Sequence, residues 1–76
     1  MSQIFRQRLQ GLREKRRISR RVLSELCGLS SDAVRRYERG ESEPNLTSLV
    51  RIADFFEVST DYLLGIDDKC TREQKY

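Results

Sequence analysis

The chain of 76 residues has no histidine, one proline and two cysteines, Cys27 and Cys70. A zinc site needs about four ligands at close spacing, so we expect no metal, no cofactor and two free thiols. A cysteine nucleophile would lack a histidine base, and the chain has no glycine-rich phosphate loop. We therefore expect that the protein is not an enzyme.

A long hydrophobic run is also missing. A transmembrane helix needs about 18 or more consecutive apolar residues, and the chain has no such run. The first ten residues, MSQIFRQRLQ, lack the apolar core of a secretory signal peptide. These absences predict no membrane association and a cytoplasmic location.

Acidic residues are scarce in the first half of the chain. Residues 1–40 carry 11 Lys/Arg and 4 Asp/Glu, a net charge of +7, whereas residues 41–76 carry 4 and 8, a net charge of −4, which together give the formal +3. Twelve of the 15 cations are arginine, which binds phosphate and guanine bidentately. This asymmetry favours a polyanionic partner for the basic half, although a solvated basic surface would have the same composition.

The apolar residues recur at helical spacing, and no strand pattern is present. The expected helices cover residues 3–16, 20–27, 31–38, 46–56 and 60–64. The last four are expected to begin after a capping side chain, at Ser19, Ser30, Asn45 and Ser59. Glycine is expected to end three of them, at Gly28, Gly40 and Gly65. We expect one domain over residues 1–66, followed by a polar C-terminal tail over residues 67–76.

Each expected helix has an apolar stripe that should face a shared core. The expected inward residues are Ile4, Phe5, Leu9 and Leu12; Val22, Leu23, Leu26 and Cys27; Ala33, Val34 and Tyr37; Leu46, Leu49, Val50, Ile52, Ala53 and Phe56; and Tyr62, Leu63 and Leu64. Five short helices cannot hide every large apolar group, so Phe55, Phe56, Tyr62 or Leu63 could also serve a dimer surface.

Several short motifs follow one another in a fixed order. They are Leu9-x-x-Leu12-Arg13, Ser19…Leu23-Ser24…Gly28-Leu29-Ser30, Val34-x-x-Tyr37-Glu38-Arg39-Gly40, Glu43-Pro44, Leu49-x-x-Ile52-Ala53 and Val58-Ser59-x-x-Tyr62-Leu63-Leu64-Gly65. With this set, residues 5–65 resemble the Cro/C1-type, or XRE, family of helix-turn-helix transcription regulators from bacteria and phages. The resemblance implies an all-α, compact five-helix bundle with a lambda-repressor-like fold, in which the second and third helices form the helix-turn-helix.

The function implied by the resemblance is sequence-specific binding of double-stranded DNA by a transcriptional repressor. The third helix, at about 31–38, would enter the major groove of an operator, and the protein would act as a homodimer on DNA. An alternative is an antitoxin-like protein-interaction module that uses the acidic and apolar second half of the chain.

The resemblance also implies roles for individual residues. The residues directed toward base edges would be Ser31, Asp32, Arg35 and Arg36. The phosphate contacts would come from Arg20, Ser30, Arg39 and Ser42, with Arg21 added from the cationic run beside Arg20. Arg13 and Glu38 would form a structural ion pair, whereas by sequence alone both side chains could instead face water.

Some of these positions allow two interpretations. Arg35 and Arg36 can read bases or only clamp phosphates, and Asp32 can accept a hydrogen bond from cytosine or act structurally. For Asp32 we favour the structural role, at the helix N-terminus or in a pair with one of these arginines. The run that includes Arg20 and Arg21 can clamp the DNA backbone or form a solvated corner.

Three positions depart from the usual family pattern. Arg20 stands where glutamine is common, Ser24 where alanine is common, and Asp32 where a neutral polar residue is common. Arginine can still bind phosphate, and the hydroxyl of a serine within a helix can bond back to a backbone carbonyl. The departure at Asp32 bears on which base sequence is read, and not on which groove is entered.

Overall fold

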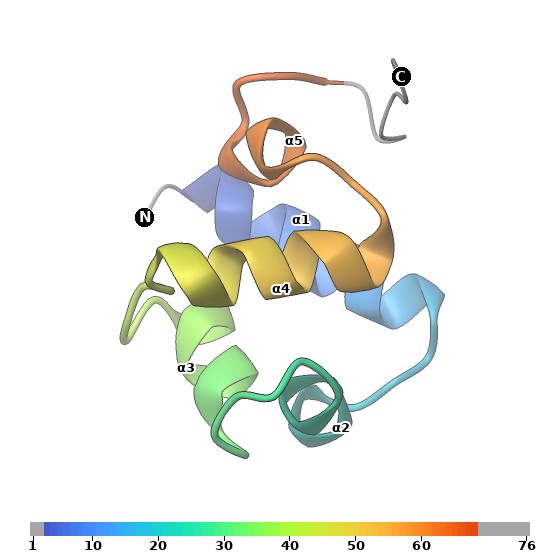
Figure 1. The fold of residues 1–76 in the computed structure, drawn as a ribbon, viewed down its shortest axis with the longest axis vertical. Helices are drawn as coiled ribbons and strands as arrows, with labels where there is room; N and C mark the ends of the chain where they lie inside the picture. Colours follow the sequence, from blue (N-terminus) through green and yellow to red (C-terminus); the bar gives the residue numbers. More distant parts are fainter. Residues whose placement is uncertain (1–2, 69–76) are drawn as a thin grey trace.

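The computed structural model describes residues 3–68, which contain five helices and no strand (Figure 1). The helices are α1 (Gln3–Lys15), α2 (Arg20–Leu26), α3 (Ala33–Arg39), α4 (Leu46–Phe56) and α5 (Thr60–Leu64). In Figure 1, α4 crosses the middle of the molecule, with α2 and α3 on one side and α5 on the other. The predicted all-α five-helix fold is confirmed. Of the predicted tail, residues 69–76 lie outside the described part of the chain.

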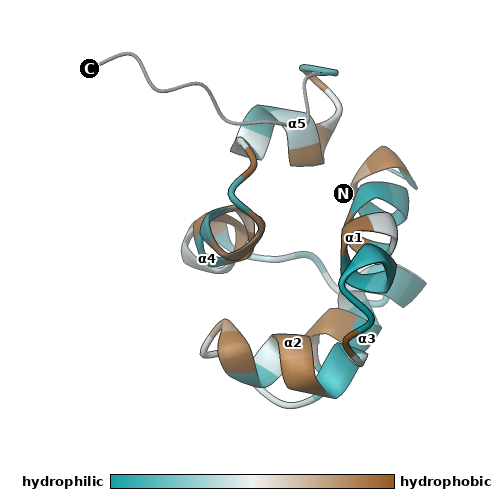
Figure 2. Cartoon of the chain, turned by 90° about the vertical axis from the view of Figure 1, so that its right-hand side faces the viewer, coloured by the Kyte–Doolittle hydropathy of each residue, from teal (hydrophilic) through white to brown (hydrophobic). Residues whose placement is uncertain are grey.

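One apolar core joins all five helices. Hydrophobic residues occur on α1, α2, α4 and α5 around it (Figure 2). The largest fully buried apolar side chains are Phe5, Leu9, Leu23, Val34, Ile52 and Leu63. α1 packs on α3 and α5, while α2 packs on α3. The third helix is therefore supported from behind by both of the helices that precede it. Within residues 3–68, no helix has both the length and the apolar character needed to cross a bilayer.

The prediction of buried residues was wrong at five positions. Each of these side chains is at least 41% exposed; they are Ile4, Val22, Leu26, Leu46 and Val50. An apolar stripe shows which residues could be buried, but burial requires a neighbouring helix to cover them. Because the seven-residue helix α2 packs through Leu23, Ser24 and Cys27, the flanking apolar residues of this helix stay at the surface.

Three of the four predicted helix caps are present. The side chains of Ser19, Asn45 and Ser59 accept hydrogen bonds from backbone N–H groups at the starts of α2, α4 and α5, at 3.0, 2.8 and 2.9 Å. These bonds satisfy N–H groups that have no partner within their own helix. They explain why the predicted starts of α2, α4 and α5 agree with the structure.

The predicted start of the third helix was wrong. α3 begins at Ala33, and its N-cap residue is Asp32, which makes no side-chain capping bond. The Ser30 hydroxyl donates a hydrogen bond to the Asp32 carboxylate at 3.5 Å. It does not accept a hydrogen bond from a backbone N–H in the first turn of α3. The polar group that the sequence offered as a cap is thus engaged by a neighbouring acid, and the helix starts two residues later.

Part of the positive charge of the first half has a structural role. The Arg8 guanidinium lies 4.2 Å from the centre of the Tyr62 ring and donates to the carbonyls of Tyr62 and Asp67. Arg16 lies 5.1 Å from the centre of the Phe55 ring and donates to the Phe55 carbonyl at 3.4 Å. Both arginines hold the ends of later helices. The net charge of residues 1–40 therefore exceeds the charge that is available to an external partner.

Cys27 is a buried thiol at the C-terminal end of α2. Burial raises the pKa of this thiol, and the nearby Arg51 guanidinium acts in the opposite direction. Because the thiolate is the reactive form, we expect iodoacetamide at about pH 8 to modify Cys27 slowly in the folded protein and rapidly in denaturant. The test is mass spectrometry on a Cys70→Ser variant, since Cys70 lies outside the described residues. Equal rates with and without denaturant would contradict this expectation.

Candidate nucleic-acid interface

The α3 helix has a buried face and a cationic face. Val34 and Tyr37 point into the core, and the Tyr37 ring packs edge-on against Phe5 with 6.5 Å between ring centres. The three arginine side chains of α3 lie away from this face and are 37–59% exposed; they are Arg35, Arg36 and Arg39. The helix is thus anchored by its apolar residues and presents guanidinium groups to the outside.

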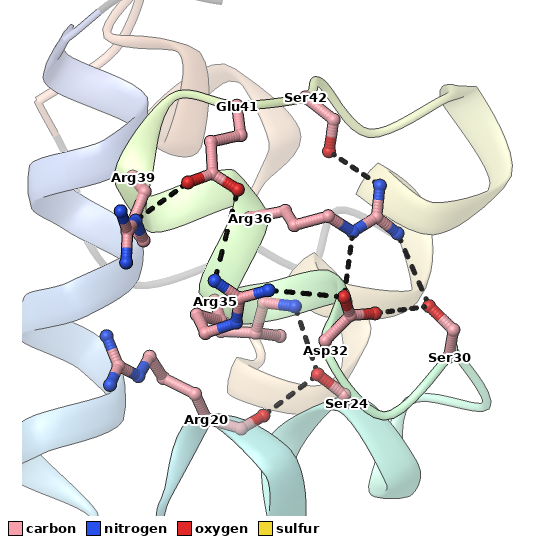
Figure 3. A network of polar contacts seen from close by, with 10 residues as sticks. Arg20, Ser24, Ser30, Asp32, Arg35, Arg36, Arg39, Glu41 and Ser42 are labelled. Carbon is pink, nitrogen blue, oxygen red and sulfur yellow. Dashed lines mark hydrogen bonds and ion pairs between the residues drawn. The ribbon is translucent and has the colours of Figure 1, made fainter.

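A buried serine fixes α3 against α2. The Ser24 hydroxyl donates to the Arg20 carbonyl at 2.8 Å and accepts from the Val34 N–H at 3.0 Å (Figure 3). The predicted bond back to a carbonyl of the same helix is confirmed. The bond to α3 was not predicted, because it depends on how closely the two helices approach. Ser24 therefore gives the first turn of α3 a defined position on α2.

Asp32 lies between two of the outward arginines. One of its carboxylate oxygens, Oδ2, is 3.4 Å from Arg35 Nη2 and 3.4 Å from Arg36 Nε (Figure 3). These are the i,i+3 and i,i+4 spacings at which helical side chains meet. The contacts support the structural interpretation of Asp32 that the sequence favoured.

Glu41 binds the same arginine cluster from the other side. Its Oε1 atom is 3.9 Å from Arg35 Nη1, and its Oε2 atom is 2.8 Å from Arg39 Nε. Gly40 has a φ of 76°, a left-handed conformation that glycine adopts without strain, and it turns the chain at the end of α3. Glu41 was not among the predicted site residues. Its only signal was its place directly after a helix-ending glycine.

Arg36, which was predicted to read a base, contacts two serines that were predicted to bind phosphates. Its Nη1 atom donates to the Ser42 hydroxyl at 3.2 Å, and its Nη2 atom donates to the Ser30 hydroxyl at 3.4 Å (Figure 3). Ser30 precedes α3 and Ser42 follows it, so this one side chain connects both flanks of the helix. The structure brings these three residues together on one surface.

Arg20 and Arg21 extend the cationic surface onto α2. Within residues 3–68 the Arg20 guanidinium has no hydrogen-bond or ion-pair partner, and in Figure 3 it extends beside the α3 arginines. Arg21 pairs with Glu25 at 3.3 Å. A hollow of about 400 Å³ lies between the N-terminal parts of α2 and α3. It is lined by Ser19, Arg20, Arg21, Ser31, Asp32 and Arg35. Residues predicted for base and phosphate contacts therefore share one continuous surface.

Arg13 and Glu38 form a two-bond ion pair behind this surface. Arg13 Nε and Nη2 donate to the two Glu38 carboxylate oxygens at 2.7 and 3.2 Å. The side chains are 14% and 5% exposed. Arg13 also donates to the Ile18 carbonyl at 3.0 Å, a contact that the sequence did not indicate. The pair connects α1 to the end of α3 and reaches the turn before α2.

Known proteins of one family are similar to this chain. A family model described as helix-turn-helix matches residues 9–63. The chain is 33% identical to the repressor protein C2 of Salmonella phage P22 over 66 residues, which cover 87% of this chain and 31% of that protein. It is 34% identical to the uncharacterized HTH-type transcriptional regulator YobD of Bacillus subtilis over 65 residues, covering 86% and 58%. The chain spans 31% to 58% of the length of its curated relatives.

Solved structures agree with these sequence matches. A P22 c2 repressor in complex with a synthetic operator superposes with a TM-score of 0.76 at 33% identity, covering 83% of this chain and 96% of that one. The N-terminal DNA-binding domain of SinR from Bacillus subtilis superposes with a TM-score of 0.75 at 23% identity, covering 83% and 93%. The second similarity concerns the fold alone.

Proposed function

The chain belongs to the helix-turn-helix family of the Cro/C1, or XRE, type, and we propose that it binds double-stranded DNA sequence-specifically as a transcriptional repressor. The observation that carries this proposal is the exposed arginine face of α3, which the buried Val34 and Tyr37 hold outward. The similar phage protein is named a repressor, and its structure contains operator DNA. We propose that the protein acts in the cytoplasm, by binding alone and without catalysis.

We propose that α3 lies in the major groove, which is wide enough for one α-helix. The residues assigned to base edges are Ser31, Arg35 and Arg36, and Asp32 is assigned the role of holding the two arginines in position. The residues assigned to phosphates are Arg20, Arg21, Ser30, Arg39 and Ser42. Their common surface across α2, α3 and the residues that flank α3 supports assigning all of them to one DNA interface. The DNA-binding domain would comprise residues 1–66.

We also propose that two copies bind one operator, with their α3 helices about 34 Å apart, one turn of DNA. The dimer surface would lie near α4 and α5. Phe56 and Leu63 are buried in the core and cannot contribute to it, whereas Phe55 and Tyr62 are only partly buried. Val50 adds an exposed apolar side chain on α4.

Selection from a pool of random duplexes tests the proposed function. We expect one sequence motif to be enriched, with the two-fold symmetry that a homodimer imposes. Affinity for the enriched duplex should fall steeply with salt, because each neutralised phosphate releases counterions. The absence of any enriched motif, together with an affinity that does not change with salt, would contradict the proposal.

Two substitutions should separate base reading from phosphate binding. Arg35→Ala should weaken binding to the enriched duplex by about 1–3 kcal/mol and relax the preference at one base position. Arg20→Ala should weaken binding to all sequences equally and reduce the slope of log affinity against log salt by about one. Titrations of the enriched duplex and its single-base variants, at several salt concentrations, measure the base preference and the salt slope of each variant. An unchanged base profile for Arg35→Ala would show that this side chain reads no base.

A further inference from the structure

Two carboxylates alternate with the three arginines of the α3 surface. In order, the contacts run Arg36–Asp32–Arg35–Glu41–Arg39. The five side chains carry a net charge of +1, whereas the three arginines alone would carry +3. Before DNA is bound, the surface assigned to base reading is therefore partly neutralised and held by internal ion pairs.

We propose that Asp32 and Glu41 determine specificity: they hold Arg35 and Arg36 ready for base edges, and they compete with DNA phosphates for the arginines that they contact, Arg39 included. This inference rests on the proposed DNA-binding function. Its basis is that both acids touch the arginines expected to meet DNA, whereas the buried Glu38 pairs with Arg13 behind them.

The ion pairs can open when DNA binds. The side chains of Asp32 and Glu41 are about half exposed, and ion pairs of this kind are individually weak. A phosphate can therefore replace a carboxylate as the partner of an arginine. The displaced carboxylate then lies close to the negative DNA backbone, which is a cost on every duplex.

At a matching site, contacts between the arginines and bases offset the repulsion between the displaced carboxylates and the DNA backbone, whereas contacts with phosphates alone do not. Asp32 and Glu41 contact Arg35 at different nitrogens, Nη2 and Nη1, which restricts its side-chain conformations. A restricted guanidinium loses less freedom when it meets the two fixed acceptors of guanine, N7 and O6. The two acids should therefore lower affinity for random DNA more than affinity for a matching site.

The test compares Asp32→Asn and Glu41→Gln with the wild-type protein. Both changes remove one negative charge and keep the side-chain size, and asparagine is also a favourable N-cap residue. Affinity is measured for the duplex that the wild type enriches and for a duplex pool of random sequence. We expect random-pool affinity to rise about three- to tenfold and affinity for the enriched duplex to change by less than about twofold.

Glu57→Gln is the matched control. Glu57 is an exposed residue with the same charge at the C-terminal end of α4. This end of α4 lies away from α3 in Figure 1. We expect both affinities of this variant to stay within about twofold of wild type. Thermal melting of every variant establishes that the fold is retained.

Several results would overturn the inference. If Asp32→Asn weakens binding to the enriched duplex and leaves random-pool affinity unchanged, Asp32 is a direct base contact. If Glu57→Gln raises random-pool affinity as much as Asp32→Asn does, the effect is one of overall charge. If the wild type binds no duplex, the proposed function itself fails. The last result differs from the first two, in which the wild type still binds DNA.

Discussion

Glu38→Gln is expected to lower the free energy of unfolding by about 3 kcal/mol. The substitution keeps the shape of the side chain but leaves the Arg13 guanidinium with only the more exposed Glu14 carboxylate, at 4.0 Å, as a charged partner. Arg13 is 14% exposed and Glu38 is 5% exposed, so water can replace little of the lost interaction. A small domain has a total stability of only about 5–15 kcal/mol, so this loss is a large fraction of it.

Urea unfolding measures the effect, and two further variants interpret it. Glu25→Gln breaks the Arg21–Glu25 pair, whose side chains are 76% and 56% exposed, and should cost less than about 1 kcal/mol. Replacing both Arg13 and Glu38 with methionine should recover part of the stability, because no unpaired charge is then left buried. If Glu38→Gln costs no more than Glu25→Gln, the buried pair does not stabilise the fold.

Ser24→Val is expected to lower the free energy of unfolding by about 2–4 kcal/mol. The substitution removes the acceptor of the buried Val34 N–H, and it inserts an additional methyl group at a side chain that is fully buried. Both effects act where α2 meets α3. DNA affinity should therefore also fall in the fraction of molecules that remain folded, because the first turn of α3 is displaced.

Two serine-to-alanine variants complete this test. Ser24→Ala removes only the hydroxyl and should cost less than Ser24→Val, although it also leaves the Val34 N–H unpaired. Ser48→Ala is the control, at a buried serine of α4 whose hydroxyl joins no two helices within residues 3–68. Urea unfolding gives the stabilities, and amide hydrogen exchange at Val34 reports on the bond itself. Exchange at Val34 that is equally slow in Ser24→Ala and in wild type would contradict the role given to Ser24.

The fold could be predicted from the sequence largely because its helix boundaries are local. Ser19, Asn45 and Ser59 cap helices through bonds to N–H groups three residues later, and the sequence alone contains this information. The failure at the start of α3 is also local, since Ser30 had a competing partner in Asp32. A sequence pattern does not show which of two nearby partners the Ser30 hydroxyl will bind.

Burial and the detailed site were harder to predict because they depend on neighbours distant in sequence. Leu26 and Leu46 match helical apolar stripes, but no other helix covers them. The bond from the Val34 N–H to Ser24 requires the packed positions of α2 and α3. The contacts of Glu41 with Arg35 and Arg39 depend on how the chain turns at Gly40. The pairing of Asp32 within its own helix was accessible from spacing alone.

Methylation interference on the enriched duplex tests most directly whether α3 reads bases in the major groove. Dimethyl sulfate modifies guanine N7, which lies in the major groove, and adenine N3, which lies in the minor groove. We expect N7 methylation at one guanine of each half-site to block wild-type binding, and this interference to disappear in Arg35→Ala. Binding that tolerates N7 methylation throughout the site but is blocked by N3 methylation would contradict the assignment of α3 to the major groove.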